Sequence, residues 1–297
     1  MDRHSSLIEL IDYFAQEALR EAEKGNAFCD PTELAFLKTE TKSDDELFRI
    51  LRGLLNQRPP LQADESIRTL EEIFFKEEAE RKGITDSALI FSGKKNEKNR
   101  CISNQLNKTA LWKGDFTALR ISAVVNYASP DLSGCWIPGH NCIDNRIHTF
   151  AGTKLRYACS KIILAQGFEE NPGNARLTKA YSLPSEYIIH TVLPEVHFEI
   201  TEQHRETLDR CIESCLDLAE ENCLFTVAFP CITEGTSGFT EKEACITLIK
   251  AVKSWKENHR DSSVNILFCA EEDELFCMYE NELKKSGLLQ AFIQEKL

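Results

Sequence analysis

The stretch LFTVAFPCITEGTSGF, residues 224–239, has the pattern that decides the fold class of most of this chain. Its first six residues are apolar or β-branched, which predicts a buried strand, and the glycine-rich segment after it predicts a turn. A helical pattern of apolar residues follows at residues 242–258. A buried strand that leads through a short loop into a helix is the repeating unit of α/β sheets.

The same alternation of strands and helices extends in both directions from this stretch. It predicts a three-layer α/β fold with a mixed, largely parallel central sheet and helices on both faces. The other predicted strands are residues 109–112, 121–125, 176–178, 187–192 and 264–268. The other predicted helices of this part are residues 144–166, 202–222 and 273–285.

The first part of the chain has a different pattern, with helical periodicity only. Helices are predicted at residues 5–25, at 44–58 with Asp44 and Asp45 as caps, and at 64–82. A polar patch at residues 92–100 is the predicted boundary. We therefore expect a helical N-terminal extension at residues 1–90 and an α/β domain at residues 91–297.

Composition and charge exclude several classes of protein. The 297 residues carry a net charge of −13, which disfavours non-specific binding to nucleic acid or to anionic membranes. An anionic ligand would have to be held by local backbone donors. The sequence shows neither an apolar run of membrane-spanning length nor a secretory signal, and its twelve cysteines favour a reducing compartment. A cytoplasmic location is the expectation.

Residues 134–152, GCWIPGHNCIDNRIHTFAG, contain the densest group of metal-ligand side chains. Cys135, His140 and Cys142 fall within eight positions, and Pro138 and Gly139 between them favour a turn. Thiolate and imidazole are ligands that Zn²⁺ prefers, and three protein ligands leave a fourth position open, as in catalytic zinc sites. Two alternatives are a chance grouping of buried cysteines and a structural site closed by His148, which we expect to face the helix packing instead.

Three further features point to a ligand with phosphate and amine groups, each beside a simpler interpretation. The loop at residues 233–239 offers backbone amides that could converge on a phosphate, although an ordinary turn explains it equally well. Asp115 could accept a hydrogen bond from an exocyclic amine, or it could cap a turn. Asn126 ends an apolar strand, where amides reach ligands but also build turns.

Four segments together resemble a known family. GDFTALRISAVVN, GCWIPGHNCIDNRIHTFAG, NARLTKAYSLPSEYIIHTVLP and VAFPCITEGTSGF occur in the order found in macrodomains. They are most similar to the zinc-dependent macrodomain protein-ADP-ribose hydrolases of the sirtuin-linked type, whose members also carry a helical N-terminal extension. The resemblance covers the chain from about residue 105 to the end, and the segment with the three metal-ligand residues is its most specific part.

The resemblance implies roles for individual residues. Asp115 would hold the adenine amino group beside the Phe116 backbone, Asn126 would contact the distal ribose, and the loop at residues 233–239 would wrap the diphosphate. Zn²⁺ would be bound by Cys135, His140 and Cys142. The candidate catalytic residues are Asp144 and Asn145. The implied ADP-ribose contacts are Asp115, Phe116, Asn126, Cys142, Ile143, Asp144, Asn145, Thr233, Gly235, Thr236, Ser237, Gly238 and Phe239.

The implied activity is removal of mono-ADP-ribose from protein side chains, with mono-ADP-ribosylated protein as substrate and a sirtuin-like ADP-ribosyltransferase as a possible partner. The chain departs from the family pattern in three places: Ser129 replaces an asparagine, Glu234 brings an acid into the phosphate loop, and CAEEDE at residues 269–274 lacks the aromatic residue often found after the last strand. Two alternatives therefore remain, a non-catalytic ADP-ribose reader with a structural zinc and an interaction protein with a purely structural zinc.

Overall fold

The computed structural model describes residues 2–35, 39, 41–92, 100–106, 108–233 and 238–289. The described chain divides into two compact units that alternate along the sequence. We call them the helical unit, with residues Met1–Lys82, Asp131–Glu169 and Ala180–Leu183, and the sheet unit, with residues Gly83–Pro130, Glu170–Lys179 and Pro184–Leu297. No described helix is long and apolar enough to cross a membrane.

Within its described residues, the sheet unit is built on seven strands in the order β2-β3-β9-β8-β5-β7-β6. The five inner strands pair in parallel, whereas β2 and β6 are antiparallel edges. The predicted mixed, largely parallel sheet is therefore confirmed. The strands of this sheet are β2 (Cys101–Asn104), β3 (Thr109–Lys113), β5 (Ala123–Tyr127), β6 (Ala175–Lys179), β7 (Tyr187–Thr191), β8 (Thr226–Pro230) and β9 (Asn265–Ala270). A small second pair joins β1 (Thr85–Asp86) to β4 (Leu119–Arg120).

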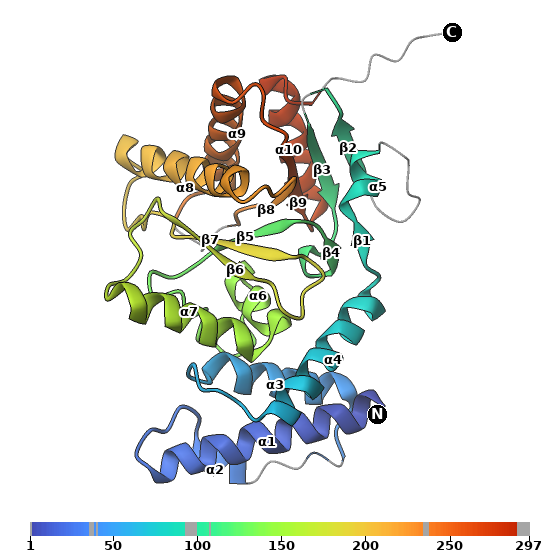
Figure 1. Ribbon diagram of the computed structural model, residues 1–297, viewed down its shortest axis with the longest axis vertical. Helices are drawn as coiled ribbons and strands as arrows, with labels where there is room; N and C mark the ends of the chain where they lie inside the picture. Colours follow the sequence, from blue (N-terminus) through green and yellow to red (C-terminus); the bar gives the residue numbers. More distant parts are fainter. Residues whose placement is uncertain are drawn as a thin grey trace. The chain divides into compact units, whose positions relative to one another are not determined.

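Inner strands are buried on both faces because each carries a nearly continuous apolar run, as parallel strands do. Val124, Ile188, Val227 and Leu267 are at most 1% exposed. Helix α9 (Glu241–Asn258) packs against both α8 (Glu202–Glu221) and α10 (Asp273–Ser286), and α8 and α10 also contact the sheet (Figure 1). The short helix α5 (Ser87–Phe91) and the 3₁₀ turn η1 (Phe116–Ala118) complete this unit.

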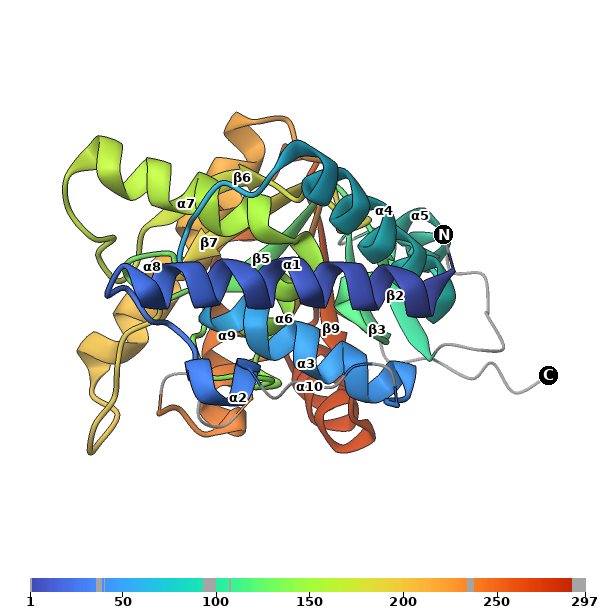
Figure 2. The same ribbon diagram turned by 90° about the horizontal axis from the view of Figure 1, so that it is seen from below.

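In the helical unit, the elements within the described residues are all helices. They are α1 (Arg3–Glu23), α2 (Pro31–Ala35), α3 (Asp44–Gln57), α4 (Glu65–Lys82), α6 (Ile143–Ala151) and α7 (Thr153–Gln166). Helix α1 lies along α3 (Figure 2), and α3 in turn contacts α6. Phe48 of α3 and Phe75 of α4 both pack on Phe150 of α6, with ring centroids 6.0 and 5.9 Å away. The N-terminal helices and α6 thus share one core.

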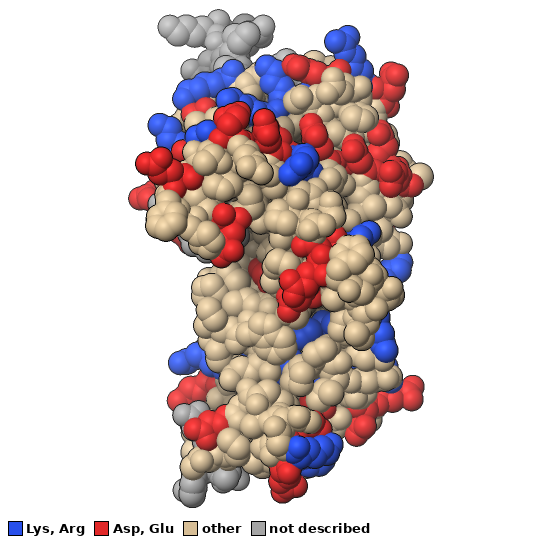
Figure 3. Space-filling model, turned by 90° about the vertical axis from the view of Figure 1, so that its left-hand side faces the viewer, with Lys and Arg blue, Asp and Glu red and all other residues tan. Residues whose placement is uncertain are grey.

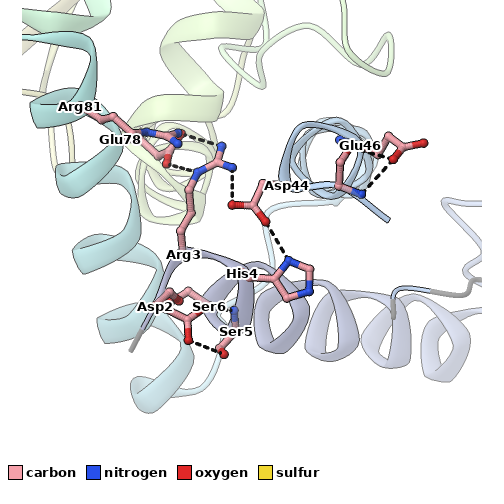
Figure 4. Close-up of polar contacts among 10 residues, drawn as sticks. Asp2, Arg3, His4, Ser5, Ser6, Asp44, Glu46, Glu78 and Arg81 are labelled. Atoms are coloured by element: carbon pink, nitrogen blue, oxygen red, sulfur yellow. Dashed lines mark hydrogen bonds and ion pairs between the residues drawn. The ribbon is translucent and has the colours of Figure 1, made fainter. Parts of the chain in front are cut away.

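Polar contacts at one end of this core join three helices (Figure 4). Arg3 of α1 pairs with Asp44 of α3 at 3.0 Å and with Glu78 of α4 at 2.8 Å. His4 reaches the other oxygen of Asp44 at 2.7 Å, and Arg81 also pairs with Glu78. These ion pairs help to fix the orientation of α1, α3 and α4 relative to one another, while the apolar faces of the helices supply most of the stability.

Two local predictions were wrong. Helix α3 begins after Ser43, not at a cap formed by Asp44 and Asp45, because Ser43 and Glu46 make a reciprocal capping box. The single helix expected at residues 144–166 is two helices, α6 and α7, separated at Gly152. Gly152 has φ +83° and ψ 177°, which breaks the helical path and which side chains disfavour.

The predicted boundary between residues 90 and 91 remains a prediction about domains. The two compact units do not follow it, because the segment Asp131–Glu169 belongs to the same unit as the N-terminal helices. The predicted metal ligands lie in this segment. The helical unit therefore contains the candidate metal centre.

Candidate metal centre and active site

A tight turn brings the first two predicted metal ligands together. His140 donates its backbone N–H to the carbonyl of Ile137 at 3.2 Å, and Gly139 within this turn has φ +66°. That left-handed conformation suits glycine because it has no Cβ. The Cys135 Sγ and His140 Nδ1 atoms consequently lie 3.4 Å apart. We call residues 135–142 the metal loop.

All three predicted ligands converge. One ligand atom each from Cys135, His140 and Cys142 lies within 4.8 Å of the others. A tetrahedral zinc with Zn–S of ~2.3 Å and Zn–N of ~2.1 Å would separate a sulfur and a nitrogen by roughly 3.6 Å. The donor set and its spacing therefore fit zinc. Across the described residues no fourth cysteine, histidine or carboxylate joins this group, and His140 is exposed.

Cys142 also starts helix α6. As the N-cap, its Sγ accepts a hydrogen bond from the Asn145 backbone N–H at 3.4 Å. The positive end of the helix dipole at this position favours negative charge on the sulfur. Burial acts in the opposite direction and is the larger effect, since it raises the pKa of the Cys142 thiol to about 12. A bound cation is what would favour the thiolate here.

Asp144 lies in the first turn of α6, two residues after this cap, and only 7% of it is exposed. Its Oδ1 is 3.5 Å from Nε2 of His148, one helical turn further on. His148 is buried, as expected, and its ring packs on Gly134, where an added Cβ would lie 2.6 Å from the imidazole. His148 therefore borders the base of the metal loop without joining the ligand group.

Asn145 is fully buried, and its side chain is engaged by the loop. Its Nδ2 donates to the Ile137 carbonyl at 3.0 Å, and its Oδ1 accepts from Arg52 at 2.9 Å. Ile143 is also buried. A catalytic role for Asn145 remains a prediction, while these contacts show that it holds the turn of the metal loop.

Arg52 and Asn56 are functional candidates that the sequence analysis missed. Both lie on α3, four positions apart and so on one side of the helix, and both contact the metal loop. Only one signal in the sequence could have pointed to them: polar residues within the apolar pattern of an N-terminal helix. It does not identify the partner.

The other predicted ADP-ribose contacts lie in the sheet unit. Asp115 follows β3, and Thr233 follows β8. Strands β3 and β8 are both parallel to β9, which lies between them, so their carboxyl ends lie at the same edge of the sheet, where ligands bind in such folds. Asp115 caps the turn η1: its Oδ1 accepts from the backbone N–H of Thr117 at 2.8 Å and from the Thr117 hydroxyl at 2.6 Å. The adjacent Phe116 is buried.

Asn126 lies inside β5, opposite His190 of β7. Its side chain is fully buried and makes a 3.1 Å hydrogen bond with Nδ1 of His190. Burial lowers the pKa of His190 to about 3, so this imidazole is neutral. The hydrogen bond to His190 fixes the Asn126 amide within β5, and contact of this amide with a ribose remains a prediction.

The predicted phosphate loop is described only at its ends. Gly235, Thr236 and Ser237 lie outside the described residues. Thr233 is exposed, Phe239 is buried, and Gly238 has φ +80° with the Val196 carbonyl oxygen 2.3 Å from where a Cβ would stand. Only glycine fits this position. Helix α9 begins two residues after Phe239, so the loop leads into a helix N-terminus, the arrangement that binds phosphates.

Known proteins show the same combination of sequence and fold. A macro domain profile matches residues 125–248. The chain is 36% identical to a protein-ADP-ribose hydrolase of Treponema medium over 235 residues, or 78% of this chain and 86% of that protein. It is 32% identical to a protein-ADP-ribose hydrolase of Staphylococcus aureus strain MSSA476, covering 82% of this chain and 88% of that protein.

The Oceanobacillus iheyensis macrodomain solved with ADP superimposes with a TM-score of 0.55 at 24% identity, over 63% of this chain and 96% of that one. This match supports the fold. The match to the relatives extends well beyond the macro domain profile and covers most of their length. This chain therefore belongs to the macro domain protein-ADP-ribose hydrolase family.

Proposed function

We propose that this protein removes mono-ADP-ribose from modified protein side chains and that the hydrolysis depends on zinc. Family membership supports the reaction. The observation that supports zinc is the convergence of Cys135, His140 and Cys142 within 4.8 Å at the start of α6, next to the buried carboxyl group of Asp144. A Cys₂His set with an open fourth position is typical of catalytic zinc.

The proposed chemistry divides between the metal and the neighbouring carboxylate. Cleavage of the bond at the anomeric carbon of ribose develops positive charge on the sugar. When bound, zinc would supply Lewis-acid polarisation of an oxygen at the reacting ribose. Asp144 would orient the attacking water or stabilise the developing positive charge. The buried position of Asp144 strengthens either interaction, because water screens it less.

The proposed ADP-ribose contacts follow the family pattern. Asp115 would accept from the adenine amino group, and Asn126, held by His190, would contact the distal ribose. Cys142, Ile143, Asp144 and Asn145 would border the ribose that reacts. The backbone amides of the loop at residues 233–239, together with the N-terminus of α9, would offset the charge of the diphosphate.

The test is release of ADP-ribose from a mono-ADP-ribosylated protein, measured with and without a zinc chelator. We expect zinc to copurify at one ion per chain, and we expect chelation and Cys135→Ala to abolish both zinc content and release. Cys101→Ala, which removes another half-buried cysteine, is the matched control and should retain both.

Two outcomes would overturn parts of the proposal. Full release of ADP-ribose by a zinc-free Cys135→Ala protein would refute the role of the metal. Calorimetric binding of ADP-ribose by the wild-type protein without any release would instead identify a non-catalytic reader.

A further inference from the structure

The metal loop is held from the N-terminal helices, and this observation carries our inference. Helix α3 contacts the loop at three residues, Arg52, Gly53 and Asn56. The Arg52 and Asn56 side chains make hydrogen bonds to it, and between them the backbone at Gly53 lies so near that a Cβ there would be 3.9 Å from the Pro138 side chain. All of these residues belong to the helical unit.

Arg52 acts at both ends of the turn. Its Nη2 donates to the carbonyl of His140, a predicted ligand, at 3.0 Å, and to Oδ1 of Asn145 at 2.9 Å. Asn145 in turn donates to the Ile137 carbonyl, where the turn begins. One guanidinium group thus restrains the His140 backbone directly and Ile137 through one intermediate.

Asn56 secures the middle of the turn. Its Oδ1 accepts from the Gly139 N–H at 2.9 Å, and its Nδ2 donates to the Thr149 hydroxyl of α6 at 3.1 Å. The side chain is 1% exposed, and its oxygen and nitrogen both have partners. The Gly139 N–H is therefore held in the left-handed conformation that brings His140 towards Cys135.

A third contact comes from Arg156 on α7. Its Nη1 donates to the carbonyls of Leu55 and Asn56 at 3.0 and 2.9 Å, near the C-terminus of α3. Its guanidinium lies 4.4 Å from the ring centre of Trp136, the residue after Cys135. The C-terminal end of α3 thus holds Gly139 directly through Asn56, and it holds Trp136 through Arg156.

We infer that Arg52 and Asn56 are positioning residues that pre-form the metal loop, which makes the N-terminal helices a working part of the metal centre. Zinc affinity then includes little of the cost of ordering residues 135–142, because α3 has already ordered them. Partners of this kind around metal ligands contribute about 10–100-fold to metal affinity. The inference rests on the proposed zinc site.

The test compares zinc affinity in three variants by competition with a chromogenic chelator. Arg52→Met removes both hydrogen bonds while keeping an unbranched side chain, and we expect zinc affinity to fall by about 10–100-fold. Arg52→Lys keeps the charge and carries its N–H donors on one nitrogen, like the single Nη2 atom that reaches both acceptors, so it should lose less. Arg49→Met is the matched control on the same helix, because the Arg49 side chain donates a hydrogen bond to the Asp45 carbonyl of its own helix. This variant should bind zinc as the wild type does.

A second readout separates positioning from loss of folding. The visible spectrum of the Co²⁺-substituted protein reports the geometry of the thiolate and imidazole ligands, and we expect it to change in Arg52→Met while metal-free thermal unfolding stays near that of Arg49→Met. If Arg52→Met does not fold, the same two measurements on Arg52→Lys decide the matter.

Unchanged zinc affinity and an unchanged Co²⁺ spectrum in a folded Arg52 variant would overturn the inference. Absence of zinc binding by the wild-type protein is a different result, since it would refute the metal in the proposed function. The two failures are thus distinguishable.

Discussion

Asp144 has a position in the structure that fits its proposed role in the reaction. It is nearly buried, follows the Cys142 cap, and belongs to the first turn of α6. We expect Asp144→Ala to slow release of ADP-ribose by at least about 10²-fold, the usual contribution of a positioned acid or base. Zinc content should be unchanged because Asp144 is outside the ligand group. Single-turnover kinetics and metal analysis check this, and a variant with near-normal turnover would remove Asp144 from the mechanism.

At the same scale, sequence separation decides which site residues could be predicted. The convergence of Cys135, His140 and Cys142 was predictable because the three side chains and the turn between them fall within eight positions. Arg52 and Asn56 were not, because the backbone groups they hold lie 88 and 83 residues further along the chain. Tertiary packing decides which helix contacts which loop, and the local periodicity of the sequence does not predict that packing.

Among the elements, helix α7 depends on a cap supplied by another helix. Gly152, its N-cap residue, has no side chain to accept a hydrogen bond, and the Glu71 carboxylate of α4 accepts it instead. The Glu71 carboxylate accepts from the Thr153 N–H at 3.0 Å and from the Thr153 hydroxyl at 2.6 Å. Burial raises the pKa of Glu71, and these two donors partly offset that effect.

We therefore expect Glu71→Ala to lower the free energy of unfolding by about 1–3 kcal/mol, because two buried donors lose their partner. The neighbouring Glu72→Ala is the control: Glu72 pairs with Lys76 and Lys154 near the surface, and such pairs contribute about 0–1 kcal/mol. Urea unfolding of both variants measures the difference. Equal destabilisation would show that the cap is not what stabilises α7.

Elements with strong periodicity were the predictable ones. The helices α1, α4, α8, α9 and α10 appeared within about two residues of expectation because each has a long apolar stripe or a clear stop signal. The break at Gly152 between α6 and α7 was missed, and the cap from Glu71 with which α7 begins could not be predicted because it is a tertiary contact. Strand β2 was missed because Cys101–Asn104 is a short edge strand without an apolar alternation.

For the molecule as a whole, the two compact units do not coincide with the two parts of the chain that differ in sequence pattern. The change from helical to alternating pattern suggested a boundary near residue 90, whereas the segment Asp131–Glu169 belongs with the N-terminal helices. A segment inserted between β5 and β6 thus shares its core with residues far earlier in the chain. Local patterns predict elements, but they do not show which elements share a core.

Net charge leads to a prediction about ligand approach. Acidic side chains outnumber basic ones by 48 to 35, and both kinds are spread over the face in Figure 3. A net charge of −13 repels the anionic diphosphate of ADP-ribose over about 30 Å at 0.01 M salt, but over only about 8 Å at 0.15 M. We expect the association rate of ADP-ribose to rise about 2–5-fold between these concentrations, because steering here is repulsive. Stopped-flow binding measures it, with uncharged adenosine as the salt-insensitive control. A rate that falls with salt would show that basic groups near the site outweigh the net charge.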